Sequence, residues 1–216
     1  PLFVKDGAIR FPKTPFVTAG GVRTTLDGTL RIGTWEPDWE LTIDAPDLVE
    51  AERLAENFYP AIQKQPLTPP LKLGGSGRLV ARLTRSFSDP HVSGRLEASP
   101  FVLRAVPFGA ATADFVVDRN VLTLDPLEAR DADGRLVVRG QVGWGGALGK
   151  EYRLTGLVTE AERWPVERIL SFLTIDLPIA GQVTGRLPLE GVTPRVVGSG
   201  ELAFEGARLW GQPFDR

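Results

Sequence analysis

The residue types that could support catalysis gather in one short run, SDPH, from Ser88 to His91. In serine hydrolases a histidine takes the proton of a serine hydroxyl while a carboxylate orients the histidine ring. Those three side chains converge from different parts of a fold. Here Ser88, Asp89 and His91, the single histidine of the chain, are near neighbours in sequence, and neighbours in an extended segment cannot converge in that way. We therefore expect a turn at this run and no hydrolase chemistry.

Other runs resemble ligand or acid–base sites but lack what each site needs. Asp131–Gly134 (DADG) begins like a calcium-binding loop, yet the twelfth position is Val142 and not a glutamate. The glycine run GGSG lacks the lysine of a phosphate-binding loop and precedes a strand pattern. Glu50 and Glu52 fall in a helical pattern, on a side that we expect to face solvent. The sequence thus predicts a non-enzymatic protein with no metal site and no cofactor.

Composition excludes further classes of function. The 216 residues carry a net charge of −2, so no basic surplus is present to bind nucleic acid. There is no cysteine and no apolar run of the length that crosses a membrane as a helix. The sequence begins at Pro1 without a methionine, and we expect it to be a segment of a longer protein whose anchoring element lies elsewhere.

The dominant pattern along the chain is an alternation of apolar and polar residues. It is clearest at Gly77–Leu83, Asp114–Asp118, Gly134–Gly140 and Glu201–Glu205. Alternation with period two is typical of antiparallel strands that have one apolar and one solvated face. The sequence predicts about a dozen such strands.

Short polar runs between the strands predict tight turns. We expect hairpin turns at Lys5–Gly7, Leu26–Gly28, Asp118–Asn120 and Asp131–Gly134, because Asp-Gly and Asn favour the backbone conformations that hairpins need.

Two segments have helical spacing instead. A helix is expected around residues 47–59, with Asp47 as its N-cap and Pro60 as its stop. A second, shorter helix is expected within Glu162–Leu173, with Pro165 in its first turn.

A long internal repeat organises these elements. The phrase from Ser88 to Gly109 returns between Val192 and Phe214, and in both halves a helix precedes a glycine-rich strand. We therefore expect a partial repeat over residues 1–70, a complete repeat of antiparallel strands over 71–163, and a helix with the start of the next repeat over 164–216.

The order of these phrases resembles the AsmA-like/TamB superfamily of diderm bacteria. The phrases are GSGRLVARLTRSFSDPHVSGRLEASPFVLRAVPFG, DADGRLVVRGQV and the later GQVTGRLPLEGVTPRVVGSGELAFEGARLWGQPF. The resemblance implies an elongated, curved antiparallel sheet (a β-taco, or repeating β-groove) with an apolar concave face. It also implies a periplasmic segment of a protein anchored in the inner membrane, which carries phospholipid to the outer membrane. A link to outer-membrane protein assembly through an Omp85-type barrel is implied as well.

If the sheet curls, the apolar face of its strands lines a groove for phospholipid acyl chains, which needs no catalytic residue. The residues expected there are Leu79, Ala81, Leu83, Phe101, Leu103, Phe115, Val117, Leu122, Leu124, Leu136, Val138, Leu187, Leu189, Leu202 and Phe204. The alternative is that the same residues form the closed, dry core of β-sandwich-like repeats, in a structural or binding module.

Overall fold

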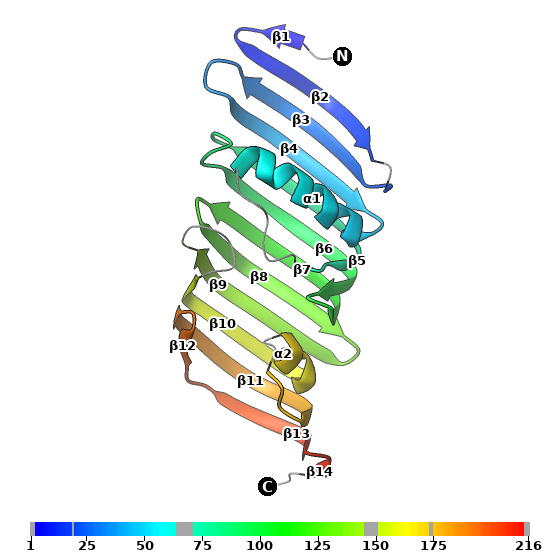
Figure 1. Ribbon diagram of the computed structural model, residues 1–216, viewed down its shortest axis with the longest axis vertical. Helices are drawn as coiled ribbons and strands as arrows, with labels where there is room; N and C mark the ends of the chain where they lie inside the picture. The colour runs from blue at the N-terminus through cyan, green and yellow to red at the C-terminus, as the bar shows by residue number, and fades with distance from the viewer. Residues whose placement is uncertain (1–2, 19, 64–70, 145–150, 173–174, 214–216) are drawn as a thin grey trace.

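In the computed structural model the chain forms one open antiparallel sheet, described over residues 3–18, 20–63, 71–144, 151–172 and 175–213. Its strands follow the order β1-β2-β3-β4-β5-β6-β7-β8-β9-β10-β11-β13-β14, with β12 paired to β11 beside β13. Figure 1 shows a long ladder with the two termini at opposite ends and both helices over the same face. The bounds are β1 (Phe3–Lys5), β2 (Ala8–Val17), β3 (Arg23–Arg31), β4 (Glu36–Ala45), α1 (Leu48–Gln63), β5 (Gly74–Thr84), β6 (His91–Leu103), β7 (Val106–Asp118), β8 (Val121–Asp131), β9 (Gly134–Trp144), β10 (Tyr152–Pro165), α2 (Val166–Phe172), β11 (Ile179–Val192), β12 (Arg195–Gly198), β13 (Glu201–Leu209) and β14 (Gln212–Pro213).

This architecture confirms the predicted fold class, a mainly β chain in an elongated, curved antiparallel sheet with two short helices. All strands in the described part of the chain belong to a single sheet, which does not close on itself. The β-sandwich alternative needs a second sheet facing the first. The described residues contain no second sheet, so that alternative does not describe this fold.

Three of the four predicted turns join strands, and one does not. The chain turns after Lys5, after Asp118 and after Asp131, as expected from the polar runs there. The run Leu26–Gly28 instead lies inside β3. Gly28 is opposite Trp39 of β4, and a Cβ atom at Gly28 would lie 2.0 Å from the carbonyl oxygen of Asp38. The glycine serves a close approach of two strands, a role that its sequence context does not distinguish from a turn.

The sheet bends because several strands carry extra residues. The pairing register shifts within residues 11–14, 98–101, 124–127 and 154–157. Each such bulge leaves residues unpaired, kinks its strand and increases the local right-handed twist. Distributed along the ladder, these bulges give a curved sheet.

Helix α1 begins where local chemistry favours a start. The backbone N–H of Val49 donates to Asp47 Oδ1 at 2.9 Å, which confirms Asp47 as the N-cap of α1. The prediction that Pro60 ends this helix is wrong, because α1 continues to Gln63. A proline removes one helical hydrogen bond, but the next turn can still form.

Helix α2 is shorter than the predicted segment, since β10 extends to Pro165 and pairs with β9 and β11.

Each helix is inserted between two strands that pair directly with each other. Helix α1 connects β4 to β5, and α2 connects β10 to β11. Figure 1 shows both helices lying across the ladder on the same face. This recurrence of strand, helix and strand is consistent with the predicted repeat, whose boundaries stay a prediction.

Glu52 differs from its expected solvated position. Its side chain is buried, and its carboxylate accepts hydrogen bonds from the backbone N–H groups of Lys72, at 2.8 Å, and Leu73, at 2.7 Å. Glu50 instead forms an ion pair with Arg53 on the helix surface. The acid at position 52 therefore fixes the chain just before β5 against α1. Helical spacing alone could not show this contact, because its partners are about twenty residues away.

Candidate functional site: an open apolar face of the sheet

Cross-strand pairing aligns the apolar residues into rows on one face. Residues directly opposite each other in an antiparallel pair point to the same side of a sheet, so the register can be followed from strand to strand. A first row crosses from β3 to β11 without a break: Gly28, Trp39, Leu83, Val92, Val117, Leu122, Val142, Leu154 and Gly191.

Two further rows lie beside the first. The second row is Leu26, Leu41, Ala81, Gly94, Phe115, Leu124 and Gly140, followed after a bulge by Leu157 and Leu189. The third row is Thr24, Ile43, Leu79, Leu96, Ala113, Leu127, Val138, Thr159 and Leu187. We call these three rows together the open apolar surface. At about 4.8 Å between strands it extends about 38 Å along the ladder.

The predicted lining residues differ in how much protein covers them. Ala81, Phe101 and Leu136 are buried, and Leu202 and Phe204 are exposed, at 43% and 49%. The remaining ten are half-buried: Leu79, Leu83, Leu103, Phe115, Val117, Leu122, Leu124, Val138, Leu187 and Leu189. Half-burial of so many large aliphatic side chains on one face means that the protein covers this surface only in part.

A fourth row, nearer the helices, belongs to a protein core over most of its length, and its last residue, Leu202, is exposed. It consists of Ala45, Gly77, Ala98, Ala111, Ala129, Leu136, Ala161, Gly185 and Leu202. Most of these side chains are small, which lets Leu48 of α1 approach Gly77 closely. The core itself joins this row to Phe101, Phe108 and the fully buried Trp164.

Phe101, Leu103 and Leu136 therefore depart from the expectation that they line a groove. Phe101 and Leu136 are members of the core, and Leu103 packs against it. There the ring of Phe108 stacks on Trp164 at a centroid distance of 6.1 Å and contacts Phe172 edge to face at 5.8 Å. Val138 and Ile43 of the third row also pack against this core, so the third row is the border between the core and the open apolar surface. Alternation identified the face of these residues correctly, but it carries no information on which part of that face a helix covers.

Several residues of the open apolar surface escaped the sequence prediction. They are Val92, Leu96, Leu127, Val142 and Leu154, all half-buried. Val92 and Leu96 continue the alternation of β6 and could have been found from it. Leu127 could not, because a bulge between Leu124 and Leu127 displaces the alternation by one residue.

The N-terminal end of the open apolar surface is aromatic. The ring of Trp39 contacts Phe11 at a centroid distance of 5.6 Å and Phe87 at 5.4 Å. The indole N–H of Trp39 is buried without a hydrogen-bond acceptor among the described residues. Tryptophan combines a large apolar ring with one donor, a combination suited to a boundary between apolar and polar surroundings.

The opposite face of the sheet is polar and is crossed by ion pairs between strands. They are Arg10–Asp27, Arg82–Asp38, Arg95–Asp114, Arg135–Glu128 and Arg139–Glu160, with N–O distances of 2.9–3.4 Å. Exposed pairs of this kind each contribute about 0–1 kcal/mol, so their main effect is to keep this face solvated.

Glu128 is the most perturbed acid of that face. It accepts hydrogen bonds from Arg135, at 2.9 Å, and from Arg130, at 2.6 Å. The Arg135 guanidinium, with a smaller contribution from Arg130, lowers the pKa of Glu128 to about 2. This carboxylate stays charged in ordinary buffers and holds β8 to β9 on the polar side.

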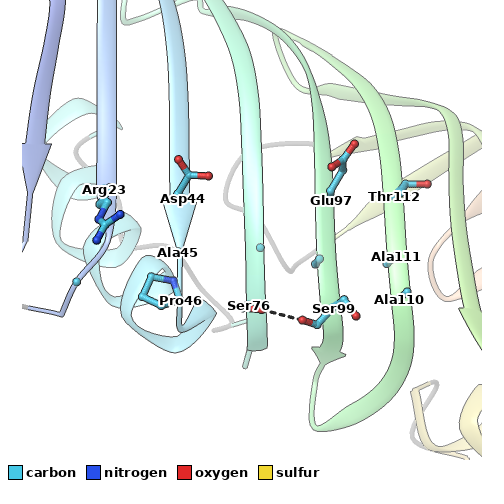
Figure 2. Close-up of a pocket in the computed structure, with 13 residues that line it drawn as sticks. Arg23, Asp44, Ala45, Pro46, Ser76, Glu97, Ser99, Ala110, Ala111 and Thr112 are labelled. Atoms are coloured by element: carbon cyan, nitrogen blue, oxygen red, sulfur yellow. Dashed lines mark hydrogen bonds between the residues drawn. The ribbon is translucent and has the colours of Figure 1, made fainter.

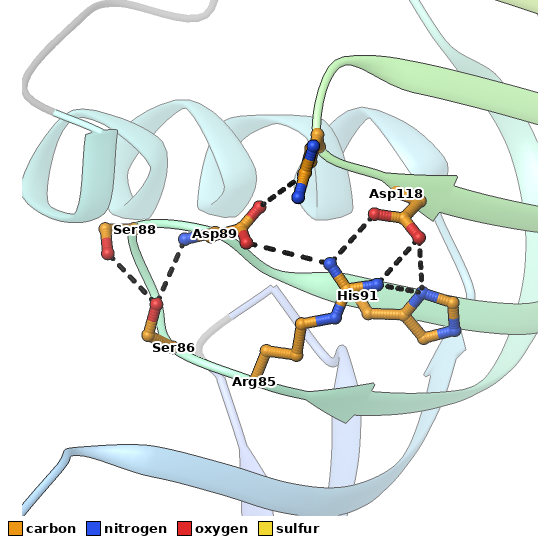
Figure 3. Close-up of polar contacts among 7 residues, drawn as sticks. Arg85, Ser86, Ser88, Asp89, His91 and Asp118 are labelled. Atoms are coloured by element: carbon orange, nitrogen blue, oxygen red, sulfur yellow. Dashed lines mark hydrogen bonds and ion pairs between the residues drawn. The ribbon is translucent and has the colours of Figure 1, made fainter.

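The Ser88–His91 run lies in a surface network of charges (Figure 3). Ser88 shares a hydrogen bond with Ser86 at 3.0 Å, while His91 Nδ1 lies 3.4 Å from Asp118. Arg85 donates to both carboxylate oxygens of Asp118, at 2.9 and 2.7 Å, and lowers the pKa of that acid. None of the hydrogen bonds in the described part of the chain joins a serine to His91. The network connects the β5–β6 turn to the β7–β8 hairpin.

A shallow hollow of about 640 Å³ lies on the polar face, near the ends of β3 to β7. Figure 2 shows it from the side opposite α1, with Arg23, Asp44 and Glu97 over it and Ser76 hydrogen-bonded to Ser99. The hollow exists because the side chains beneath it are small. Asp44 and Glu97 already have arginine partners, so the arrangement favours no particular ligand.

No helix in the described part of the chain is both long and apolar enough to cross a membrane. A scan against models of known protein families, a search of curated proteins and a search of solved structures each found no significant match to this chain.

Proposed function

We propose that this chain is a non-catalytic segment of a periplasm-spanning, AsmA/TamB-like protein that shields phospholipid acyl chains on their way between the inner and outer membranes. The observation that carries the proposal is the open apolar surface, three rows of mostly half-buried apolar residues on a single sheet. In the described residues no second sheet faces these rows. An apolar surface of this extent is unusual on a soluble protein and favours an apolar ligand.

The energetics favour such a ligand without any specific polar contact. A phospholipid carries about thirty methylene groups, and each is worth about 0.8 kcal/mol when it leaves water. Passing through water would therefore cost about 20 kcal/mol. Acyl chains lying along the rows around Leu83, Val117 and Leu122 would avoid most of this cost. They would also cover side chains that the protein leaves half-exposed.

The two faces of the sheet fit this role together. The ion-pair face keeps the outside of the sheet in water, and the open apolar surface on the other side receives the lipid tails. We propose that the full-length protein is anchored in the inner membrane through other segments. It would deliver lipid near an Omp85-type barrel of the outer membrane, in a process linked to outer-membrane protein assembly.

Native mass spectrometry tests the proposal directly. The purified chain is incubated with vesicles of phosphatidylethanolamine and phosphatidylglycerol, separated from them and transferred intact to the gas phase. We expect bound species heavier than the bare chain by the mass of one or more phospholipids. A bare mass alone, under conditions that preserve a known lipid-binding protein with its lipid, would contradict the proposal.

A further inference from the structure

An aromatic cluster fills the first row where it crosses β4. Phe11 of β2 pairs with Gly28 of β3, and Gly28 is opposite Trp39 of β4, so Phe11 belongs to the same row. Because Gly28 has no side chain, the ring of Phe11 reaches over β3 to Trp39, at a centroid distance of 5.6 Å. The ring of Phe87 also contacts Trp39, at 5.4 Å. Aromatic rings therefore occupy a part of the row on which acyl chains would otherwise lie.

Phe87 reaches this cluster from a turn and not from a strand. The β5–β6 turn spans residues 85–90 and is longer than the β6–β7 and β7–β8 turns. At its tip the backbone N–H of Asp89 donates to the carbonyl oxygen of Ser86 at 3.1 Å, which closes a β-turn around Phe87. Phe87 follows β5 in sequence but contacts Trp39 of β4, and it lies outside the core cluster. The turn therefore bends back over the apolar face and places one ring on the first row.

Charged contacts fasten this turn to the β7–β8 hairpin (Figure 3). Arg85, at the base of the turn, donates to both carboxylate oxygens of Asp118. Asp89 lies 3.6 Å from Arg85 and 3.8 Å from Arg119 of the hairpin. These four side chains are exposed at 40–78%, and ion pairs between exposed groups contribute little to stability. The position of the turn thus depends on weak contacts with a hairpin two strands away.

The contact between Phe87 and Trp39 also has a cost. The indole N–H of Trp39 is buried without a hydrogen-bond acceptor among the described residues. A buried donor without an acceptor is unfavourable. The ring of Phe87 covers part of this indole. The aromatic contact therefore favours the position of Phe87 on Trp39, and the unsatisfied donor opposes it.

We propose that the β5–β6 turn is a gate on the first row, and that Phe87 is the residue that closes it. In the closed position the ring of Phe87 takes the place of an acyl chain on Trp39. In the open position the turn swings away from β4, and the contact between Arg85 and Asp118 breaks because Arg85 belongs to the same turn. An acyl chain then passes along the row between β4 and β5. The gate rests on the proposed lipid-binding function and adds to it a control on movement along the ladder.

Photolabelling of Trp39 tests the gate. The chain is mixed with a phospholipid that carries a diazirine in one acyl chain and irradiated, and the labelled residues are located by peptide mass spectrometry. In the original chain we expect labels at Val117 and Leu122 and few at Trp39. Phe87→Ala should raise the labelling of Trp39 at least about fivefold, because an aromatic contact no longer competes with the acyl chain. Labelling of Val117 and Leu122 should stay the same.

Phe16→Ala is the matched control. Phe16 is exposed and lies opposite Thr24 of the third row, so this variant removes a ring from the apolar face and leaves the first row intact. It should not change the labelling of Trp39. Labels at Val117 and Leu122, with equal labelling of Trp39 in all three proteins, would overturn the gate and leave the lipid-binding function standing. The absence of labels at all of these positions would overturn both.

A second pair of variants tests whether the charges hold the gate. Asp118→Asn weakens the contact with Arg85, whereas Asp114→Asn weakens the contact of an equally exposed acid of β7 with Arg95. Asp118→Asn should raise the labelling of Trp39 at least about twofold, and Asp114→Asn should leave it unchanged. Both acids lie on the surface, so we expect both variants to fold, which urea unfolding checks. Equal labelling of Trp39 in the two variants would overturn the proposal that this network holds the gate closed.

Discussion

The substitution Leu122→Arg places a charge in the first row of the open apolar surface without disturbing the core. Leu122 is half-buried, lies between Val117 and Val142, and is not a member of the core cluster. The aliphatic stem of arginine can cover the same neighbours while its guanidinium reaches water near the strand end. We therefore expect the free energy of unfolding to fall by only about 1 kcal/mol.

Lipid binding should respond much more strongly than stability. An acyl chain that lies over Leu122 and its two neighbours loses contact for about three methylene groups if a charge occupies that place. At about 0.8 kcal/mol each, the loss is about 2.4 kcal/mol, which is about fifty-fold in affinity. The assay is titration of the chain with a fluorescent long-chain fatty acid, accompanied by urea unfolding.

Thr123→Arg is the matched control for this experiment. Thr123 is on the same strand but points to the polar face, where it pairs with Val116 and Gln141. This variant should bind the fatty acid as the original chain does. Equal affinities of the two variants, with both proteins folded, would refute the reasoning. Unfolding of Leu122→Arg alone would show that Leu122 is sealed in a core, contrary to its described exposure.

Three further predictions concern stability. Glu52→Ala should lower the free energy of unfolding in urea by about 2 kcal/mol, because two backbone amides lose their charged acceptor. The control Glu56→Ala, on the same helix, should change this free energy by less than about 0.5 kcal/mol. The pKa of Glu128 is lowered to about 2 in the folded chain, from about 4.5 when unfolded. Its ion pair therefore stabilises the fold above about pH 4.5, and this stabilisation is lost as the pH falls from about 4.5 to 2. The difference in unfolding free energy between the original chain and Glu128→Gln, about 1 kcal/mol at pH 6, should vanish over that range. A Cβ atom at Gly94 would lie 2.5 Å from the backbone oxygen of Val80, so Gly94→Ala should lower the thermal unfolding midpoint by several degrees. At Gly33 an added Cβ atom would have no other atom within 4 Å, so Gly33→Ala should leave the midpoint unchanged.

Each of these has a clear contrary result. Equal losses from the two glutamate substitutions would mean that the link between α1 and the segment before β5 is not formed in solution. A stability difference for Glu128→Gln that persists at pH 2 would contradict the lowered pKa. An unchanged midpoint for Gly94→Ala would show that β5 and β6 are further apart at this point than described.

Alternation was a good guide to the strands because it reflects a simple physical fact, that successive side chains of a strand point to opposite faces. The strands around Leu79, Phe115, Leu136 and Phe204 were all found in this way, and the register places their predicted faces on the same side of the sheet. Asp47 was also recognisable, since an N-cap is a local interaction between a side chain and the following backbone.

What the sequence did not reveal depends on contacts between distant segments. Glu52 is buried by a segment that returns about twenty residues later, and Gly28 is needed because β4 approaches it closely. Phe101 and Leu136 have the same local pattern as Leu122, yet they lie in the core cluster and Leu122 does not. Period-two patterns describe faces, whereas coverage of a face is set by tertiary packing.

Photochemical labelling tests most directly whether lipid tails complete the apolar side of this sheet. A phospholipid with a diazirine in one acyl chain is bound to the protein and irradiated, and the labelled residues are located by peptide mass spectrometry. We predict labels concentrated at the first and second rows, at positions such as Leu83, Val117 and Leu122, and few at Arg82, Val116 or Thr123 on the polar face. Labels spread evenly over the two faces, or concentrated on the polar one, would contradict the account.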